Sequence, residues 1–148
     1  LDLKALYKTE RDACANLQAN AKDICIETAK GHESVAMAQL AFNRTGTTKD
    51  EASLLEARYK ARYELAKEKC DDLSGNDKKV CAQQAKSNRD KSKANLKQAR
   101  KVEDAVEDAA DATMKADFAV ARTKCDALTG DAKDVCVASS KARYNQRW

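Results

Sequence analysis

Three copies of one short cysteine unit constrain this chain more than any other feature. Ten residues separate the two cysteines of each pair, and the first cysteines of successive pairs lie 56 and 55 residues apart. The pairs are Cys14/Cys25, Cys70/Cys81 and Cys125/Cys136. Such spacing over 148 residues is typical of an internal repeat. Six cysteines in matched pairs also favour disulfides, and with them an oxidising compartment.

The residues between paired cysteines predict a turn between two helices. Gly75 and Gly130 suit the left-handed residue that ends a helix, and Ala19 stands at the same place in the first unit. Each unit then has a residue expected to cap the next helix: Asn20, Asn76 and Asp131. Paired cysteines would lie on either side of this turn, close enough for a bridge. We therefore predict the local disulfides Cys14–Cys25, Cys70–Cys81 and Cys125–Cys136.

The residues that precede each turn repeat as well. Apolar side chains recur at relative positions 0, 4, 11 and 14, with an aromatic residue seven positions before the first cysteine in every unit. The three sets are Leu3, Tyr7, Cys14 and Leu17; Tyr59, Tyr63, Cys70 and Leu73; and Met114, Phe118, Cys125 and Leu128. This spacing places each set on one stripe of a helix, so the pattern predicts a core seam beneath each disulfide.

Composition narrows the fold class to all-α. The chain has no proline and 4 glycines, and it is rich in the strongest helix formers. With 35% charged and 5% aromatic residues, it can bury a thin, alanine-rich core but not one thick enough to enclose an enzyme pocket. It contains no 18-residue apolar run, so we expect no membrane insertion.

Helix signals predict five helices with one very long member. We expect helices over residues 2–18, 21–43, 48–73, 77–127 and 132–147, the third of which starts with a capping box of Thr48 and Glu51. The fourth has no interior break signal, and about 50 residues at 1.5 Å each give roughly 75 Å. The predicted fold is a disulfide-stapled antiparallel helical bundle with one very long helix and a projecting C-terminal helical hairpin.

The helix lengths predict two regions in one continuous unit. Residues 1–101 can align as an up-down four-helix bundle, whereas residues 102–148 form the hairpin extension. The hairpin seam, which consists of Met114, Phe118, Val135 and Tyr144, has no expected cover from its own chain. It must fold back or pack against another molecule. Tyr144 and Trp148 share a helical face beside two arginines, a composition typical of an interface anchor, so we predict that Trp148 is buried against a neighbouring subunit.

Charge is segregated along the long helix. Residues 82–101 carry seven basic side chains against Asp90 alone: Lys86, Arg89, Lys91, Lys93, Lys97, Arg100 and Lys101. Residues 103–111 carry acids and no base: Glu103, Asp104, Glu107, Asp108 and Asp111. One interpretation is a solvated helix face. The other is that basic and acidic stretches of neighbouring subunits meet and set their register.

The sequence offers no catalytic chemistry. The sole histidine, His32, lacks enough partners for a metal site, and the cysteine spacing is not that of zinc knuckles or ribbons. Glycine-rich phosphate loops and nucleophile elbows are absent. A net charge of +4 with interleaved acids argues against nucleic-acid binding. We expect no enzyme activity, no cofactor and no metal.

The run from Cys125 to Cys136, flanked by helix rich in alanine and lysine, resembles poorly characterised exported helical proteins of proteobacteria that are often labelled as similar to Tol-type envelope helical proteins. The likeness covers the three short cysteine motifs, and the first departs from it at Ala19. It implies an envelope location and no catalytic residues. The chain also begins at Leu1 without a methionine, which fits a mature exported protein in the periplasm or outside the cell.

Two functions from different classes fit these features. The first is a structural protein that self-assembles head to tail into a fibre or lattice of the envelope or cell exterior. The second is a periplasmic helical chaperone or envelope adaptor that binds other proteins, including envelope proteins. Exposed apolar or Met-rich surface is typical of chaperone grooves, and 2 Met and 2 Phe supply little of it, so we favour the first.

Overall fold

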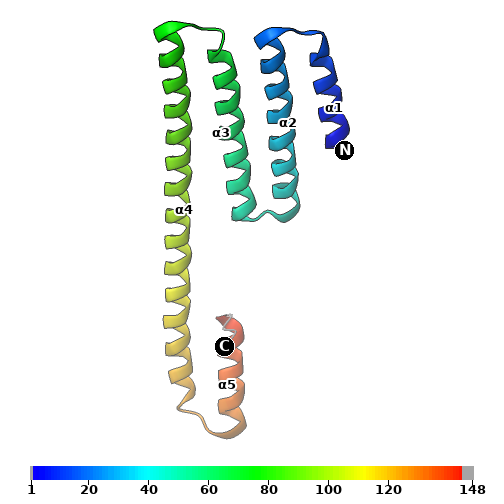
Figure 1. Cartoon of the computed structure of the whole chain (residues 1–148). Helices are drawn as coiled ribbons and strands as arrows, with labels where there is room; N and C mark the ends of the chain where they lie inside the picture. The colour runs from blue at the N-terminus through cyan, green and yellow to red at the C-terminus, as the bar shows by residue number, and fades with distance from the viewer. Residues whose placement is uncertain (1, 145–148) are drawn as a thin grey trace. The chain divides into compact units, whose positions relative to one another are not determined.

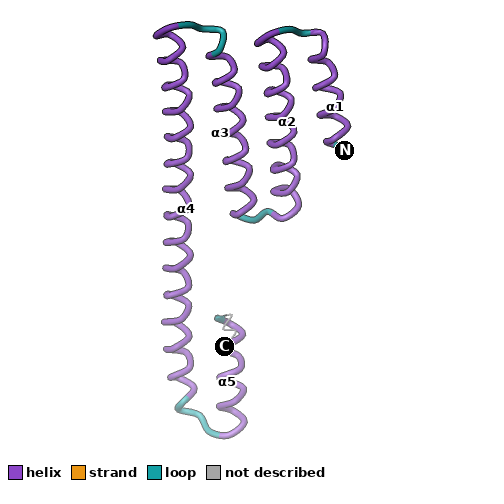
Figure 2. The backbone as a smooth tube through the Cα atoms, in the orientation of Figure 1, coloured by secondary structure: helices purple, strands orange, loops and turns teal. Residues whose placement is uncertain are grey.

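A computed structural model describes residues 2–144, which form an all-α structure with no strand among them (Figures 1 and 2). The helices are α1 (Leu3–Ala13), α2 (Ala19–Thr45), α3 (Thr48–Cys70), α4 (Gly75–Cys125) and α5 (Gly130–Arg143), with a 3-10 turn, η1 (Cys14–Asn16), after α1. Successive helices run antiparallel, and α4 is 51 residues long. The predicted fold class is confirmed, including the very long helix.

All three predicted disulfides are present, and each clips one turn between helices. The paired Cα atoms are 5.7, 5.6 and 5.7 Å apart in Cys14–Cys25, Cys70–Cys81 and Cys125–Cys136. The first cysteine of each pair is at most 2% exposed, whereas only six other side chains among the described residues are buried. Each disulfide is therefore the buried core of its turn. The helices that it joins bury few other side chains.

The turns use the predicted left-handed residue, but at a different place in the turn. Gly75 and Gly130 have φ of 57° and 60°, and each is the first residue of the following helix rather than the end of the preceding one. Ala19 takes the same conformation, with φ of 50°. The predicted caps Asn20, Asn76 and Asp131 are therefore wrong, because each already lies inside its helix.

Asn20 makes hydrogen bonds to the second turn instead of capping its own helix. Its amide donates to the backbone oxygen of Glu68 at 2.7 Å and to the Asp72 carboxylate at 2.9 Å, and these contacts join the first turn to the second.

The cap of α3 also differs from the prediction by one residue. Thr47 is the N-cap, and its hydroxyl accepts from the Asp50 backbone N–H at 3.2 Å. Thr48 is already helical, so the predicted pair with Glu51 does not form the capping box. The Asp50 carboxylate accepts from the hydroxyls of Thr45 and Thr47, and these bonds, the one from Thr45 foremost, hold the pKa of Asp50 below its usual value.

The described chain divides between residues 98 and 99 into two compact units. In the first, α1 packs on α2 and α2 on α3, while Arg89 of α4 stacks on Tyr63 of α3. Figure 1 shows these helices side by side in a row, with α1 and α4 at its two edges. A row of helices leaves two broad faces, so most apolar side chains here are half-buried or exposed.

Small residues bring α2 and α3 together at the middle of this row. A Cβ atom at Gly31 would lie 3.1 Å from the Cβ of Ala61, closer than ordinary van der Waals contact. Glycine inside a helix is usually destabilising, but Gly31, which has no Cβ, permits this close approach of the two helices. The packing of α2 against α3 leaves a hollow beside Gly31 and Ala61.

Candidate functional site

The residues predicted to mediate self-association lie in different environments in the second unit. Phe118 is 6% exposed and Met114 and Tyr144 are half-buried, whereas Val135 is 65% exposed. The prediction that nothing in the chain covers this seam is therefore wrong for Phe118. The disulfide Cys125–Cys136 joins α5 to the end of α4, and Figure 1 shows the two helices side by side. Trp148 lies outside the described residues.

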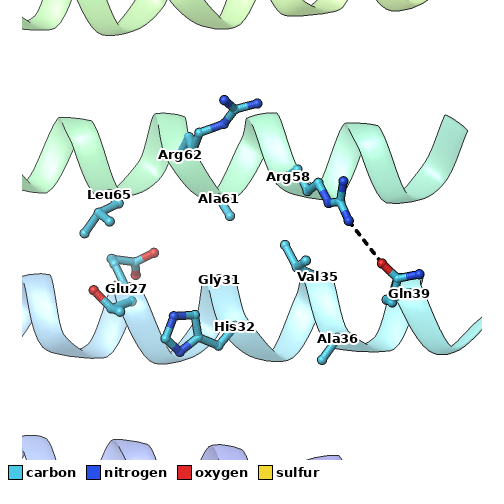
Figure 3. A pocket seen from close by; sticks show the side chains of 11 residues that line it. Glu27, Gly31, His32, Val35, Ala36, Gln39, Arg58, Ala61, Arg62 and Leu65 are labelled. Carbon is cyan, nitrogen blue, oxygen red and sulfur yellow. Dashed lines mark hydrogen bonds between the residues drawn. The ribbon is translucent and has the colours of Figure 1, made fainter. Parts of the chain in front are cut away.

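A groove of about 790 Å³ follows the packing of α2 against α3 (Figure 3). Its apolar lining comes from both helices: Gly31, Val35, Ala36, Ala61 and Leu65. Its polar lining consists of Glu27, Thr28, His32, Gln39, Arg58 and Arg62. The groove is thus an apolar channel with charged side chains along its sides.

The electrostatics of the groove favour an acidic occupant. Arg58 donates to the side-chain oxygen of Gln39 at 3.0 Å, which leaves its charge without a carboxylate partner. Arg62 makes no ion pair or hydrogen bond with any residue from 2 to 144. The one carboxylate that lines the groove, Glu27, is already paired with Lys30. Arg58 therefore reaches toward this site without a neutralising charge, whereas the Arg62 side chain points away from α2 (Figure 3).

Basic side chains are also present on the neighbouring helix. Arg62 also lines a smaller hollow between α3 and α4, of about 370 Å³, together with Arg89 and Lys91. Arg89 sits 4.4 Å from the centre of the Tyr63 ring and pairs with Asp90 at 2.9 Å. The Asp90 hydrogen bond raises the pKa of the Arg89 guanidinium. Cations thus span α3 and α4 beside the groove.

A second feature is a helical segment that no other part of the described chain covers. Every residue of α4 from 97 to 113 is exposed, and Val102 and Val106 are 54% and 65% exposed. At about 100° per residue, these valines share a face with Ala105 and Ala109. We call residues 102–111, which also contain the five acids named above, the acidic segment.

Metal and membrane sites have no support among residues 2–144. No three or more histidine, cysteine or acidic side chains come together there as a cluster that could hold a metal ion. His32 instead places its Nδ1 atom 3.1 Å from the carboxylate of Glu10, between α2 and α1. No helix in the described part of the chain is long and apolar enough to cross a membrane.

Sequence reasoning found the acidic segment but missed the groove. The signals that could have revealed it are Gly31 within a long helix and the paired arginines Arg58 and Arg62, four residues apart. Neither signal locates a groove until the partner helix is known.

Comparison of the chain with protein-family models, with curated proteins and with solved structures returned no match. The resemblance to Tol-type envelope proteins therefore stays a prediction.

Proposed function

We propose that this chain is a non-enzymatic, exported structural protein that assembles with copies of itself through helix packing. The single observation that carries the proposal is the exposed stretch of α4 from 97 to 113, with its two uncovered valines. An amphipathic helix gains most of its stability by packing its apolar face against another element. The described residues supply no packing partner for this face of α4. A second copy of the chain would supply one.

The three disulfides support the exported location. They are local and intramolecular, and structural disulfides form and persist in oxidising compartments. They also hold each turn closed without a large core, so that helix faces can stay open for association. A contact between different surfaces of two copies would repeat from copy to copy and give a fibre or lattice.

Self-association can be measured on the oxidised protein by sedimentation velocity over a range of concentrations, with negative-stain imaging of the same samples. We expect the average mass to rise with concentration and elongated or extended particles to appear. A protein that sediments as a monomer throughout would contradict the proposal.

A matched pair of variants tests the part played by the two valines. Val102→Ser with Val106→Ser removes apolar surface at nearly constant helix propensity and should weaken assembly. The control changes Val80 and Val120, which are 59% and 57% exposed, to serine and should leave assembly unchanged. Equal behaviour of the two double variants would show that Val102 and Val106 are not the contact.

The apolar groove favours a second candidate, a helical chaperone or adaptor. Near the N-terminal end of α1, Met37 and Leu40 are 52% and 55% exposed, which adds apolar surface on α2. Under this alternative the monomer would suppress aggregation of an unfolded client protein. Light scattering of a reduced client, with and without the chain, tests it.

A further inference from the structure

We propose that two copies of the chain pair antiparallel along α4 about a two-fold axis at Val102, so that the basic stretch of each copy lies against the acidic segment of the other. The contact rests on the proposed self-association and adds a second surface to it. It is isologous, because both copies use the same surface of α4.

The charges of α4 are mirrored about Val102 with opposite sign. Every base from 93 to 101 has an acid at the same distance beyond Val102. The mirrored pairs are Lys93 and Asp111, Lys97 and Glu107, Arg100 and Asp104, and Lys101 and Glu103. Asp108 is the one acid of this segment without such a base, because its mirror position is Leu96. In an antiparallel two-fold pair, each residue lies opposite its mirror position in the second copy, so this pattern is self-complementary.

Six of the mirrored side chains lie on one face of α4. They recur every three or four residues, and α4 is continuous from Gly75 to Cys125. At about 100° per residue they fall within about 80° of the helix surface. We call these six the charged stripe: Lys93, Lys97, Arg100, Asp104, Glu107 and Asp111. Lys101 and Glu103 flank it on either side.

The charged stripe has no partner within the described chain. All six residues are exposed, and none of their side chains forms an ion pair or hydrogen bond with any residue from 2 to 144. Like charges also stand four residues apart, as in Lys93 and Lys97 or Glu107 and Asp111, and such pairs destabilise a helix. Alternating charges would suit a solvated face. Segregated charges instead favour a partner of opposite sign, which a second copy supplies.

The two-fold axis brings each base of the charged stripe opposite an acid of the second copy. Arg100 and Asp104 lie nearest the axis, and Lys93 and Asp111 lie farthest from it. Symmetry repeats the three pairs, and the resulting six span 18 residues of helix, or about 27 Å. Arg–carboxylate pairs are often bidentate, which adds geometric specificity near the axis.

The charged stripe leaves the valine face of α4 free. Val102 and Val106 lie about 160° around the helix from the centre of the stripe. An isologous contact closes on itself, so the stripe alone gives a dimer. A further contact through the valines, on the opposite side of α4, would link dimers into an extended assembly. Exposed ion pairs are individually weak and are screened by salt, so the contact depends on the number of pairs and should weaken as salt is added.

Two double variants of equal net charge test the register. The matched variant carries Lys93→Glu with Asp111→Lys, which exchanges the charges of one mirrored pair and keeps opposite charges at every contact. The mismatched variant carries Lys93→Glu with Asp104→Lys, which places like charges together at both altered positions. At low salt, sedimentation velocity of the oxidised chain should show assembly of the matched variant within about threefold of the wild type. The mismatched variant should assemble about tenfold more weakly or worse.

The outcomes separate this pairing from the proposed function. Far-UV circular dichroism of each variant establishes that the helices remain folded. If the wild type assembles but the matched variant assembles no better than the mismatched one, self-association stands and this pairing is wrong. A wild type that stays monomeric at low salt overturns both the pairing and the proposed function.

Discussion

Ala19 provides the sharpest test of how the repeated turn works. It has φ of 50° at the position where the other two turns have Gly75 and Gly130, at 57° and 60°. Only glycine adopts this left-handed conformation without a steric penalty from Cβ. We therefore predict that Ala19→Gly stabilises the protein, although glycine usually destabilises a helix.

The magnitude follows from two opposing terms. The left-handed conformation costs an L-residue roughly 1–2 kcal/mol. Replacing alanine by glycine gives the unfolded chain more freedom, which costs about 0.4–1 kcal/mol. The difference is a net stabilisation of about 0.5–1 kcal/mol for Ala19→Gly.

The reverse changes complete the experiment. A Cβ at Gly75 or Gly130 would meet nothing within 4 Å, so Gly75→Ala and Gly130→Ala change only the backbone preference. Each should destabilise its turn by a similar amount, about 0.5–1 kcal/mol.

Urea unfolding of the oxidised protein, followed by far-UV circular dichroism, measures all three variants. The midpoint should rise for Ala19→Gly and fall for the two alanine variants, with the denaturant slope unchanged. If Ala19→Gly lowers the midpoint while Gly75→Ala leaves it unchanged, the left-handed residue is not what limits these turns.

Three further predictions concern packing and pH. Phe118→Ala should destabilise the protein by about 3–5 kcal/mol, because the ring is only 6% exposed, whereas exposed Val135→Ala should change unfolding by less than about 0.5 kcal/mol. Gly31→Leu should cost about 1–3 kcal/mol in urea unfolding, because it overfills the contact with Ala61. The pKa of Asp50 is lower in the folded state, so its stabilisation is present above its unfolded pKa of about 3.9 and is lost as pH falls through the folded value. Unfolding midpoints measured against pH should therefore fall less steeply on acidification in Thr45→Ala.

The repeat predicted the turns correctly because residues close together in the sequence determine the conformation of each turn. Paired cysteines, a left-handed residue and a nearby aromatic side chain all act within a few turns of helix, so sequence spacing alone identifies the disulfides. Exact helix ends were less predictable. Thr47 and Thr48 are equally suited to cap α3 by residue type, and the choice depends on Asp50, which accepts from both Thr45 and Thr47.

The groove could not be predicted because it depends on the register between two helices. Gly31 meets Ala61 across 30 residues of chain, and only this contact places Arg58 and Arg62 beside the apolar lining. Helical periodicity gives the face of each helix but not the point at which two faces meet. The same limit explains the error at Phe118, because the apolar spacing along α4 gave its face but not its burial.

The disulfides explain why a chain with so thin a core can keep its apolar faces open. Each closes a loop of about a dozen residues, which in the chain-entropy model contributes roughly 3 kcal/mol. That stabilisation acts at the three turns, where the first cysteines are nearly inaccessible to solvent. The α4 segment from 97 to 113 lies 16 residues from Cys81 and 12 from Cys125, and no disulfide restrains it directly. Its stability must come from helix propensity and from whatever covers Val102 and Val106, so this is the part of the chain whose order should depend most on association.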